Sequence, residues 1–278
     1  MLDRTWIGTT SGDFNVAGNW LEGIVPVNAD NLLFYLGARN LDTNVDQSAK
    51  TFGNVSFRSG YAGIAGVSTA TPFLFGCTNL HIEGGSTGLY LGTGAATIVN
   101  VRNLGAGPDF SRPVYLAGTI TKLNHERGPL YVPSGTITTM VAQAVQGSCE
   151  LTTPTVTTLI NKAGFLRMAS AGTITTLQSV GGFARIDAGT LTNCNVYSPN
   201  ATVEWNTAIT LAALKVYGGL FDASKSSIAR TITASELWSG GIIDIANGFD
   251  NITLTAALVQ NGGTFRRLTH TAADAIPV

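Results

Sequence analysis

The tetrapeptide GTIT occurs at residues 118–121, 135–138 and 172–175, and GTLT follows at 189–192. Each copy places one apolar residue between two threonines. Taking this apolar residue as an anchor gives a series separated by 17, 19, 18, 17 and 18 residues: Ile120, Ile137, Val156, Ile174, Leu191 and Ile209. Looser copies of the anchor occur at Ile232, Ile252, Ile98, Leu80 and Val55. A short repeat of nearly constant length is typical of a solenoid.

Each repeat also contains a second short segment that begins with glycine and then alternates apolar and variable residues. Its copies are GPLYV (128–132), GFLRM (164–168), GFARI (182–186), GLFDA (219–223) and GIIDI (241–245). Alternation with a period of two predicts a half-buried strand, whereas an amphipathic helix needs apolar residues three and four positions apart. The repeat therefore consists of short strands joined by glycine-rich corners.

A unit of about 18 residues is too small to bury its own apolar face, but stacked units bury one another and share backbone hydrogen bonds. The sequence thus predicts an all-β fold, a single-stranded parallel β-helix with coils of about 18 residues, wound right-handed like other parallel crossovers. The low fraction of charged residues, 12% against about 25% in typical domains, together with 33 glycines and many Thr, Ala, Val and Ile residues, also indicates an all-β class. We expect an N-terminal cap module over residues 1–53, the β-helix over 54–268 and a C-terminal tail over 269–278.

The repeat also predicts which side chains face the core. The anchors and the residues three positions later, such as Leu123, Leu159 and Cys194, point inward, and the flanking threonines point outward. The middle of the second strand gives another outward file, aromatic at first and charged later: Tyr90, Tyr115, Tyr131, Glu150, Arg167, Arg185, Glu204, Asp222, Asp244 and Arg266. Within it, Glu150 with Arg167 and Arg185 with Glu204 form favourable cross-strand pairs.

Residues 1 to about 50 do not repeat and contain the series W-x-G, N-W, G-x-x-P and D-x-x-x-F. Its large apolar members are Trp6, Phe14, Trp20, Pro26 and Phe34. This segment resembles a module found at the start of β-helical segments in autotransporter-like surface proteins and in tailed-phage structural proteins. Large rings of this kind can cover the open apolar end of a solenoid, so we expect an N-terminal cap. Asp13 and Asp30 fit turn and capping roles.

Charge and cysteine content narrow the range of partners. The formal net charge is −1, which provides no basic field for nucleic acid or for an acidic membrane surface. The three cysteines, Cys77, Cys149 and Cys194, form no C-x-x-C pair and fit buried apolar positions, so we expect no metal and no cofactor. The first residues, MLDRTWIGTT, carry Asp3 and Arg4 where a secretory segment needs an apolar run, which predicts a chain without an export signal.

The resemblance and the low charge together favour a non-enzymatic virion structural protein of a tailed phage. The expected role is a capsid decoration or cement protein, or a component of an appendage, made in the host cytoplasm and located in the virion. Its expected partners are capsid or other virion proteins and further copies of itself, as a homotrimer. The candidate interface combines the aromatic file with part of the threonine file: Tyr90, Tyr115, Tyr131, Thr121, Thr138, Thr157, Thr175 and Thr192. Alternatively, these tyrosines pack under the segment 105–113.

Three other functions remain open from the sequence. The front module is shared with secreted passengers, which makes a bacterial surface adhesin the closest alternative. Many polysaccharide lyases and hydrolases are β-helices, and their carboxylates and basic residues would correspond to Asp187, Asp222, Asp244, Arg167 and Arg185. No G-x-S-x-G motif occurs, and paired surface charges explain the same residues. Finally, the two threonine files resemble the T-x-T arrays of some ice-binding solenoids, although the pairs lapse at Ala208 and Asn251 in the predicted register.

Overall fold

The computed structural model describes residues 1–35, 39–84, 88–103, 114–246 and 251–267. The chain divides into two compact units, Met1–Cys149 (unit 1) and Glu150–Val278 (unit 2). It is all-β, with parallel strands stacked as a β-solenoid, and the described residues contain one short helical segment, the 3₁₀ turn η1 (Ala17–Asn19). The predicted fold class is confirmed. The expected division at residue 53 lies inside strand β3, and the expected tail over 269–278 lies outside the described residues.

The described residues of unit 1 form eight complete strands. They are β1 (Asp3–Trp6), β2 (Asn31–Phe34), β3 (Asp46–Phe57), β4 (Phe73–Ile82), β5 (Leu89–Arg102), β6 (Val114–Arg127), β7 (Leu130–Val132) and β8 (Thr136–Ala142). Each strand from β1 to β5 pairs in parallel with the next one in the chain, and β6 pairs with both β7 and β8. Strand β9 (Ser148–Leu151) includes the last residues of unit 1 and the first of unit 2.

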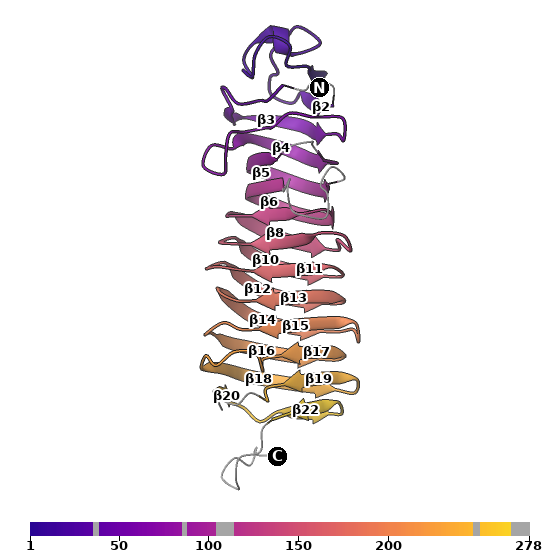
Figure 1. Ribbon diagram of the computed structural model, residues 1–278, viewed down its shortest axis with the longest axis vertical. Coiled ribbons are helices and arrows are strands. Elements are labelled where there is room, and N and C mark those ends of the chain that lie inside the picture. Colours follow the sequence, from indigo (N-terminus) through magenta and orange to yellow (C-terminus); the bar gives the residue numbers. More distant parts are fainter. Residues whose placement is uncertain (36–38, 85–87, 104–113, 247–250, 268–278) are drawn as a thin grey trace. The chain divides into compact units, whose positions relative to one another are not determined.

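Unit 2 consists of two files of stacked parallel strands (Figure 1). The first file contains β10 (Thr155–Asn161), β12 (Thr173–Ser179), β14 (Thr190–Val196), β16 (Thr210–Val216), β18 (Arg230–Trp238), and finally β20 (Ile252–Leu254) and β21 (Val259–Asn261), which both pair with β18. The second file contains β11 (Phe165–Met168), β13 (Gly182–Ile186), β15 (Ala201–Trp205), β17 (Gly219–Asp222), β19 (Gly241–Asp244) and β22 (Thr264–Arg266). One coil therefore contributes one strand to each file.

The core contains the anchors that the repeat predicts. Ile174 pairs with Val156 in the preceding coil and with Leu191 in the following one, and all three are fully buried. A second buried file, three positions later, includes Leu177 and Cys194. Such files bury apolar surface continuously, because each coil covers the next.

The structure corrects the anchors assigned to several outer coils. Leu211, not Ile209, pairs with Ile232 and is fully buried, and Ile232 in turn pairs with Leu254, not Ile252. In unit 1 the partner of Ile120 is Ala96, not Ile98. Leu80 and Val55 are also displaced: they belong to the second buried file, in register with Val99 and Leu123. The pairing of β5 with its neighbours is irregular at residues 93–96. This irregularity changes the register, so the sequence repeat no longer matches the stacked positions there.

Glycine is required where one coil turns closely over another. Gly135 has φ 118°, and a Cβ atom there would lie 2.2 Å from the backbone oxygen of Gly118 in the preceding coil. Gly219 has φ 77°, and its Cβ would lie 2.3 Å from the oxygen of Ser198. At these two corners, glycine therefore permits a positive φ and a close backbone approach that a side chain would block.

Four rings of the N-terminal segment, Trp6, Phe14, Trp20 and Phe34, form one aromatic cluster in unit 1. Trp6, Phe14, Trp20, Pro26 and Phe34 are buried, and the Trp20 ring lies edge-on to the rings of Trp6 and Phe14, with centroids 5.2 Å and 5.0 Å away. The Trp20 indole N–H donates to the backbone oxygen of Phe14 at 2.9 Å, so the buried ring keeps a polar partner. Their role as a cap, like the handedness of the coil, stays a prediction.

The two aspartates of this segment have structural roles. Asp30 is buried with Arg4, whose Nε lies 2.9 Å from its carboxylate, and it accepts backbone N–H groups from Leu2 and Val27. Burial alone would raise the pKa of Asp30, but these hydrogen bonds outweigh it and lower the pKa. Asp13 accepts hydrogen bonds from Asn44 and from a backbone N–H two residues on.

Candidate functional site

The aromatic file of unit 1 occupies consecutive strands in register. Tyr115 on β6 pairs with Tyr90 on β5 and with Tyr131 on β7. The rings of Tyr90 and Tyr115 stack with centroids 4.7 Å apart, and the ring of Tyr131 lies edge-on to Tyr115 at 5.2 Å. All three side chains are half-buried, so the file presents an ordered, partly exposed aromatic surface. The alternative cover, segment 105–113, falls outside the described residues.

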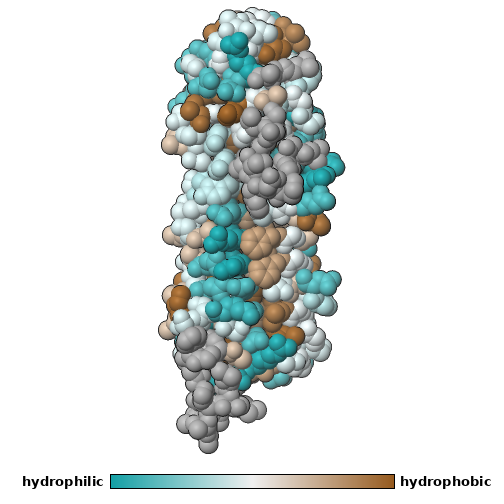
Figure 2. All heavy atoms as spheres, in the orientation of Figure 1, coloured by the Kyte–Doolittle hydropathy of each residue, from teal (hydrophilic) through white to brown (hydrophobic). Residues whose placement is uncertain are grey.

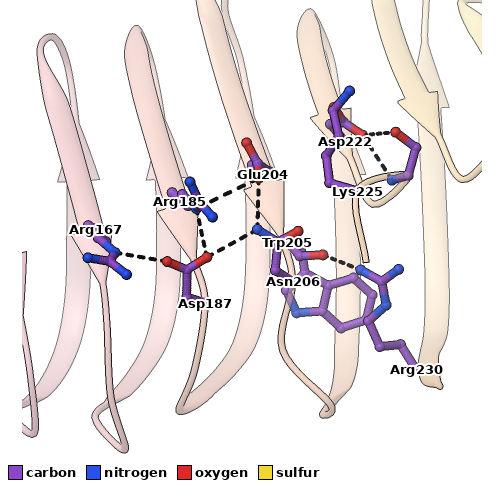
Figure 3. Close-up of polar contacts among 10 residues, drawn as sticks. Arg167, Arg185, Asp187, Glu204, Trp205, Asn206, Asp222, Lys225 and Arg230 are labelled. Atoms are coloured by element: carbon purple, nitrogen blue, oxygen red, sulfur yellow. Dashed lines mark hydrogen bonds and ion pairs between the residues drawn. The ribbon is translucent and has the colours of Figure 1, made fainter. Parts of the chain in front are cut away.

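The charged file of unit 2 is a chain of ion pairs (Figure 3). Arg167 on β11 lies 3.6 Å from Glu150, and Arg185 on β13 lies 3.7 Å from Glu204, as the repeat predicts. Asp187, which follows β13, lies between the two arginines and accepts from Arg167 at 2.8 Å and from Arg185 at 2.7 Å. Figure 2 shows hydrophilic side chains in a narrow band beside more apolar ones on the face in view.

Asp187 is held as a carboxylate. Burial would raise the pKa of Asp187, but hydrogen bonds from Arg185, Arg167 and Asn206 outweigh this effect and lower the pKa. A general base or acid near neutral pH needs a pKa shifted toward 7, so the environment of Asp187 favours a structural ion-pair network over proton transfer.

The other two carboxylates of the enzyme hypothesis also have local partners. Asp222 on β17 is in register with Glu204 and Asp244 of the predicted file, but it is buried and accepts hydrogen bonds from the N–H and hydroxyl of Ser224. Asp244 on β19 lies 3.2 Å from Arg266 on β22 and accepts the N–H of Ala246. The file therefore links neighbouring coils by surface charge pairs.

The threonines proposed for the interface all lie next to inward anchors. Thr121, Thr138, Thr157 and Thr175 are exposed, and Thr192 is half-buried. The corrected register also changes the extent of the file, because Leu211 and Leu254 as anchors place threonines on the outer face in the last coils of unit 2. Ala208 and Asn251 interrupt the threonine file only in the predicted register, which was wrong for these coils. In the observed register, Ala212 is the one residue among those described that interrupts the threonines of unit 2.

Sequence reasoning missed a polar cavity on unit 1. Its volume is about 290 Å³, and it is lined by His81, Ile82, Glu83, Asn100, Arg102 and Glu126. His81 and Asn100 lie in register on β4 and β5, with ring Nδ1 and amide nitrogen 3.3 Å apart, and Asn100 accepts from Asn124 at 2.8 Å. Glu83 forms an ion pair with Arg58. The lining comes from three coils, so no local motif in the sequence signals it.

Sequence reasoning also missed a buried arginine in unit 2. Arg230 begins β18 and is 3% exposed. Its guanidinium lies 5.1 Å from the centroid of the Trp205 ring and donates to the backbone oxygen of Trp205 (Figure 3). It also donates to the backbone oxygens of Ala223, Ser226 and Ile228. The side chain thus satisfies the carbonyl groups of the turn that joins β17 to β18.

The thiols are buried, as predicted. Burial raises the pKa of Cys77 to about 12 and also raises the pKa of Cys194, so both behave as apolar packing groups. In the described part of the chain, no three His, Cys, Asp or Glu side chains gather where they could hold a metal ion. The described residues also include no helix of the length and apolar character needed to cross a membrane.

Comparisons with protein-family models, with curated protein sequences and with solved structures gave no match. The fold and its surfaces define the class of this chain, a parallel β-solenoid with an aromatic, a charged and a threonine-rich file.

Proposed function

We propose that the chain is a non-enzymatic structural protein that works by assembly, as a homotrimeric component of a tailed-phage virion such as a capsid decoration or appendage protein. The observation that carries the proposal is the file Tyr90, Tyr115 and Tyr131. Tyrosine is enriched in interface cores, and these rings lie half-exposed on paired strands, which hold them in place without a partner.

The charged file supports a structural role for the surface of unit 2 as well. Its arginines and carboxylates neutralise one another between coils, and exposed pairs of this kind fix register more than they contribute energy. A polysaccharide lyase or hydrolase would need at least one of these carboxylates free to take or give a proton. Asp187, bound by two arginines, is the least suited of them.

Multi-angle light scattering of the full chain after size-exclusion chromatography tests the proposal. The expected mass is three times that of one chain. The double variant Tyr115→Ser, Tyr131→Ser removes two of the three rings and is expected to elute as a monomer. The control is Tyr197→Ser, which removes an exposed, stacked tyrosine of unit 2 and is expected to leave the trimer intact.

A strict monomer for the unaltered chain would contradict the proposal, and so would a trimer that persists in the double variant. The virion setting is tested separately, by cosedimentation with purified particles of the phage whose genome carries the gene. A portal, terminase or major capsid gene nearby supports the virion. A neighbouring gene for a β-barrel translocator would instead support the surface adhesin.

A further inference from the structure

The threonine face of unit 2 is a surface with a fixed two-dimensional pattern. We define it as the residues directly before and after six inward anchors: Val156, Ile174, Leu191, Leu211, Ile232 and Leu254. Eleven of these twelve residues are threonine, and the twelfth is Ala212. Threonine thus occupies the same two outward positions in coil after coil.

The spacing of the face follows from strand geometry. The two threonines of one coil are two residues apart along a strand, which places them about 6.6 Å apart, and neighbouring coils repeat at about 4.8 Å. Parallel pairing keeps the rows aligned, as in the partners Thr155 with Thr173, Thr173 with Thr190, and Thr210 with Thr231. Threonine is β-branched and restricted in its side-chain rotamers, so each methyl and hydroxyl group has a limited set of positions. The result is a rigid grid of methyl and hydroxyl groups.

The borders of the face carry no charge. The residues two positions before the first threonine of each coil, and those directly after the second, are all threonine, alanine or asparagine. Arg230 lies between two of these positions, but its side chain is buried. Among the described residues, the hydroxyls of the face form no hydrogen bond with another protein group, and they remain available to solvent.

The composition of the face disfavours nucleic acid as a partner, and it also disfavours the protein interface expected from the sequence at Thr157, Thr175 and Thr192. Without arginine or lysine it cannot neutralise the phosphates of nucleic acid. It also lacks the tryptophan, tyrosine and arginine side chains that anchor protein interfaces, where threonine is under-represented. The face measures about 29 Å by 16 Å, on the order of 450 Å². A second copy of the chain would bury less than the roughly 800 Å² per partner of a standard interface.

We propose that the threonine face of unit 2 binds ice. An ice surface is neutral, as the face is, and it is a rigid two-dimensional lattice of hydrogen-bonding oxygens that a regular grid can match over many coils. The methyl groups favour an ordered first layer of water, and the hydroxyls can both donate and accept hydrogen bonds within it. Because every coil adds a row, binding grows with the number of aligned coils, and one misfit residue disturbs its neighbours.

The test measures thermal hysteresis and inhibition of ice recrystallisation by the full chain at millimolar concentration. The central variant Thr192→Tyr places a ring on the face and is expected to lose both activities. The conservative variant Thr192→Ser keeps the hydroxyl and removes one methyl group; it is expected to retain most of the activity and shows that a substitution at this position can fold. The matched control Thr202→Tyr adds the same ring to the outward side of β15 and is expected to retain full activity. Melting curves by circular dichroism confirm that each variant is folded.

Two results would overturn the inference: no hysteresis and no recrystallisation inhibition by the unaltered chain, or equal loss of activity in Thr192→Tyr and Thr202→Tyr. The inference does not rest on the proposed assembly function. The double variant Tyr115→Ser, Tyr131→Ser is expected to keep its ice activity per chain, so failure of one proposal is distinguishable from failure of the other.

Discussion

Removal of the Arg230 side chain is expected to destabilise unit 2 far more than removal of an exposed arginine. The guanidinium is 3% exposed and donates 3.0 Å and 2.5 Å hydrogen bonds to the oxygens of Ser226 and Ala223, besides those to Trp205 and Ile228. Burial lowers the pKa of Arg230, although the charge of Asp222 acts in the opposite direction, so the cation is retained at some cost in solvation.

The magnitude follows from the groups that would lose their partner. In Arg230→Ala, the buried oxygens of Trp205 and Ala223 become unsatisfied at about 1–3 kcal/mol each. The stacked contact with the Trp205 ring is lost at about 1 kcal/mol. Relief from burying a charge offsets part of this sum. We expect the free energy of unfolding to fall by about 3 kcal/mol.

Urea unfolding, followed by circular dichroism and by tryptophan fluorescence, measures this change; two probes are needed because two compact units can unfold separately. The control is Arg167→Ala, whose side chain is 42% exposed and forms surface ion pairs, with an expected loss below about 1 kcal/mol. Arg230→Lys should fall between the two, because one ammonium group cannot reach four carbonyls. If Arg230→Ala is no more destabilising than Arg167→Ala, the role assigned to Arg230 is wrong.

Three further predictions concern single buried groups. Burial lowers the pKa of His125 from 6.5 to about 4, so between pH 6.5 and pH 4 only the unfolded state binds a proton at this residue. The free energy of unfolding should therefore fall by about 3 kcal/mol as the pH falls across that window. In urea titrations, His125→Val should make this fall smaller. Gly219→Ala should lower the free energy of unfolding by about 2 kcal/mol or more, because φ is positive and the new Cβ meets the oxygen of Ser198. The control Gly94→Ala, with open space around it, should change the free energy of unfolding in urea by less than about 0.5 kcal/mol. The Cys194 thiol should react with a thiol reagent only after denaturation, and rapid labelling of the native chain would contradict its burial.

The repeat in the sequence was sufficient to predict the fold, because a stack of coils requires nearly constant coil length and a buried anchor in each coil. The central anchors from Ile120 to Leu191 and the ion pairs of Arg167 and Arg185 were predicted for this reason. The outer anchors were not. Ile209 looks like an anchor, but it lies in a turn before β16, and the residue that enters the core is Leu211.

The structural features that could not be predicted depend on how neighbouring coils pair, and a local stretch of sequence does not specify this pairing. Ala96 carries a weaker apolar signal than Ile98, and only the irregular pairing of β5 places Ala96 over Ile120. Arg230 precedes a threonine in a strand, where an exposed charge is the usual expectation. Three of its carbonyl partners lie in the 223–228 turn just before it, but the contact with Trp205 comes from a strand 25 residues earlier and is not visible in the local sequence. The continuity of the threonine face became visible only with the observed register.

Disulfide trapping between neighbouring coils tests the central claim, that each 17–22-residue repeat of unit 2 is one coil stacked in register on the next. Thr173 and Thr190 are paired residues on β12 and β14, with Cα atoms expected about 4.8 Å apart, within the range that a disulfide spans. The double variant Thr173→Cys, Thr190→Cys should therefore oxidise readily to an intramolecular disulfide, measured by mass spectrometry. The pair Thr175→Cys, Thr190→Cys is shifted by two residues to about 8 Å, beyond that range, and should stay reduced. Equal trapping of both pairs would contradict the register and, with it, the aligned threonine face.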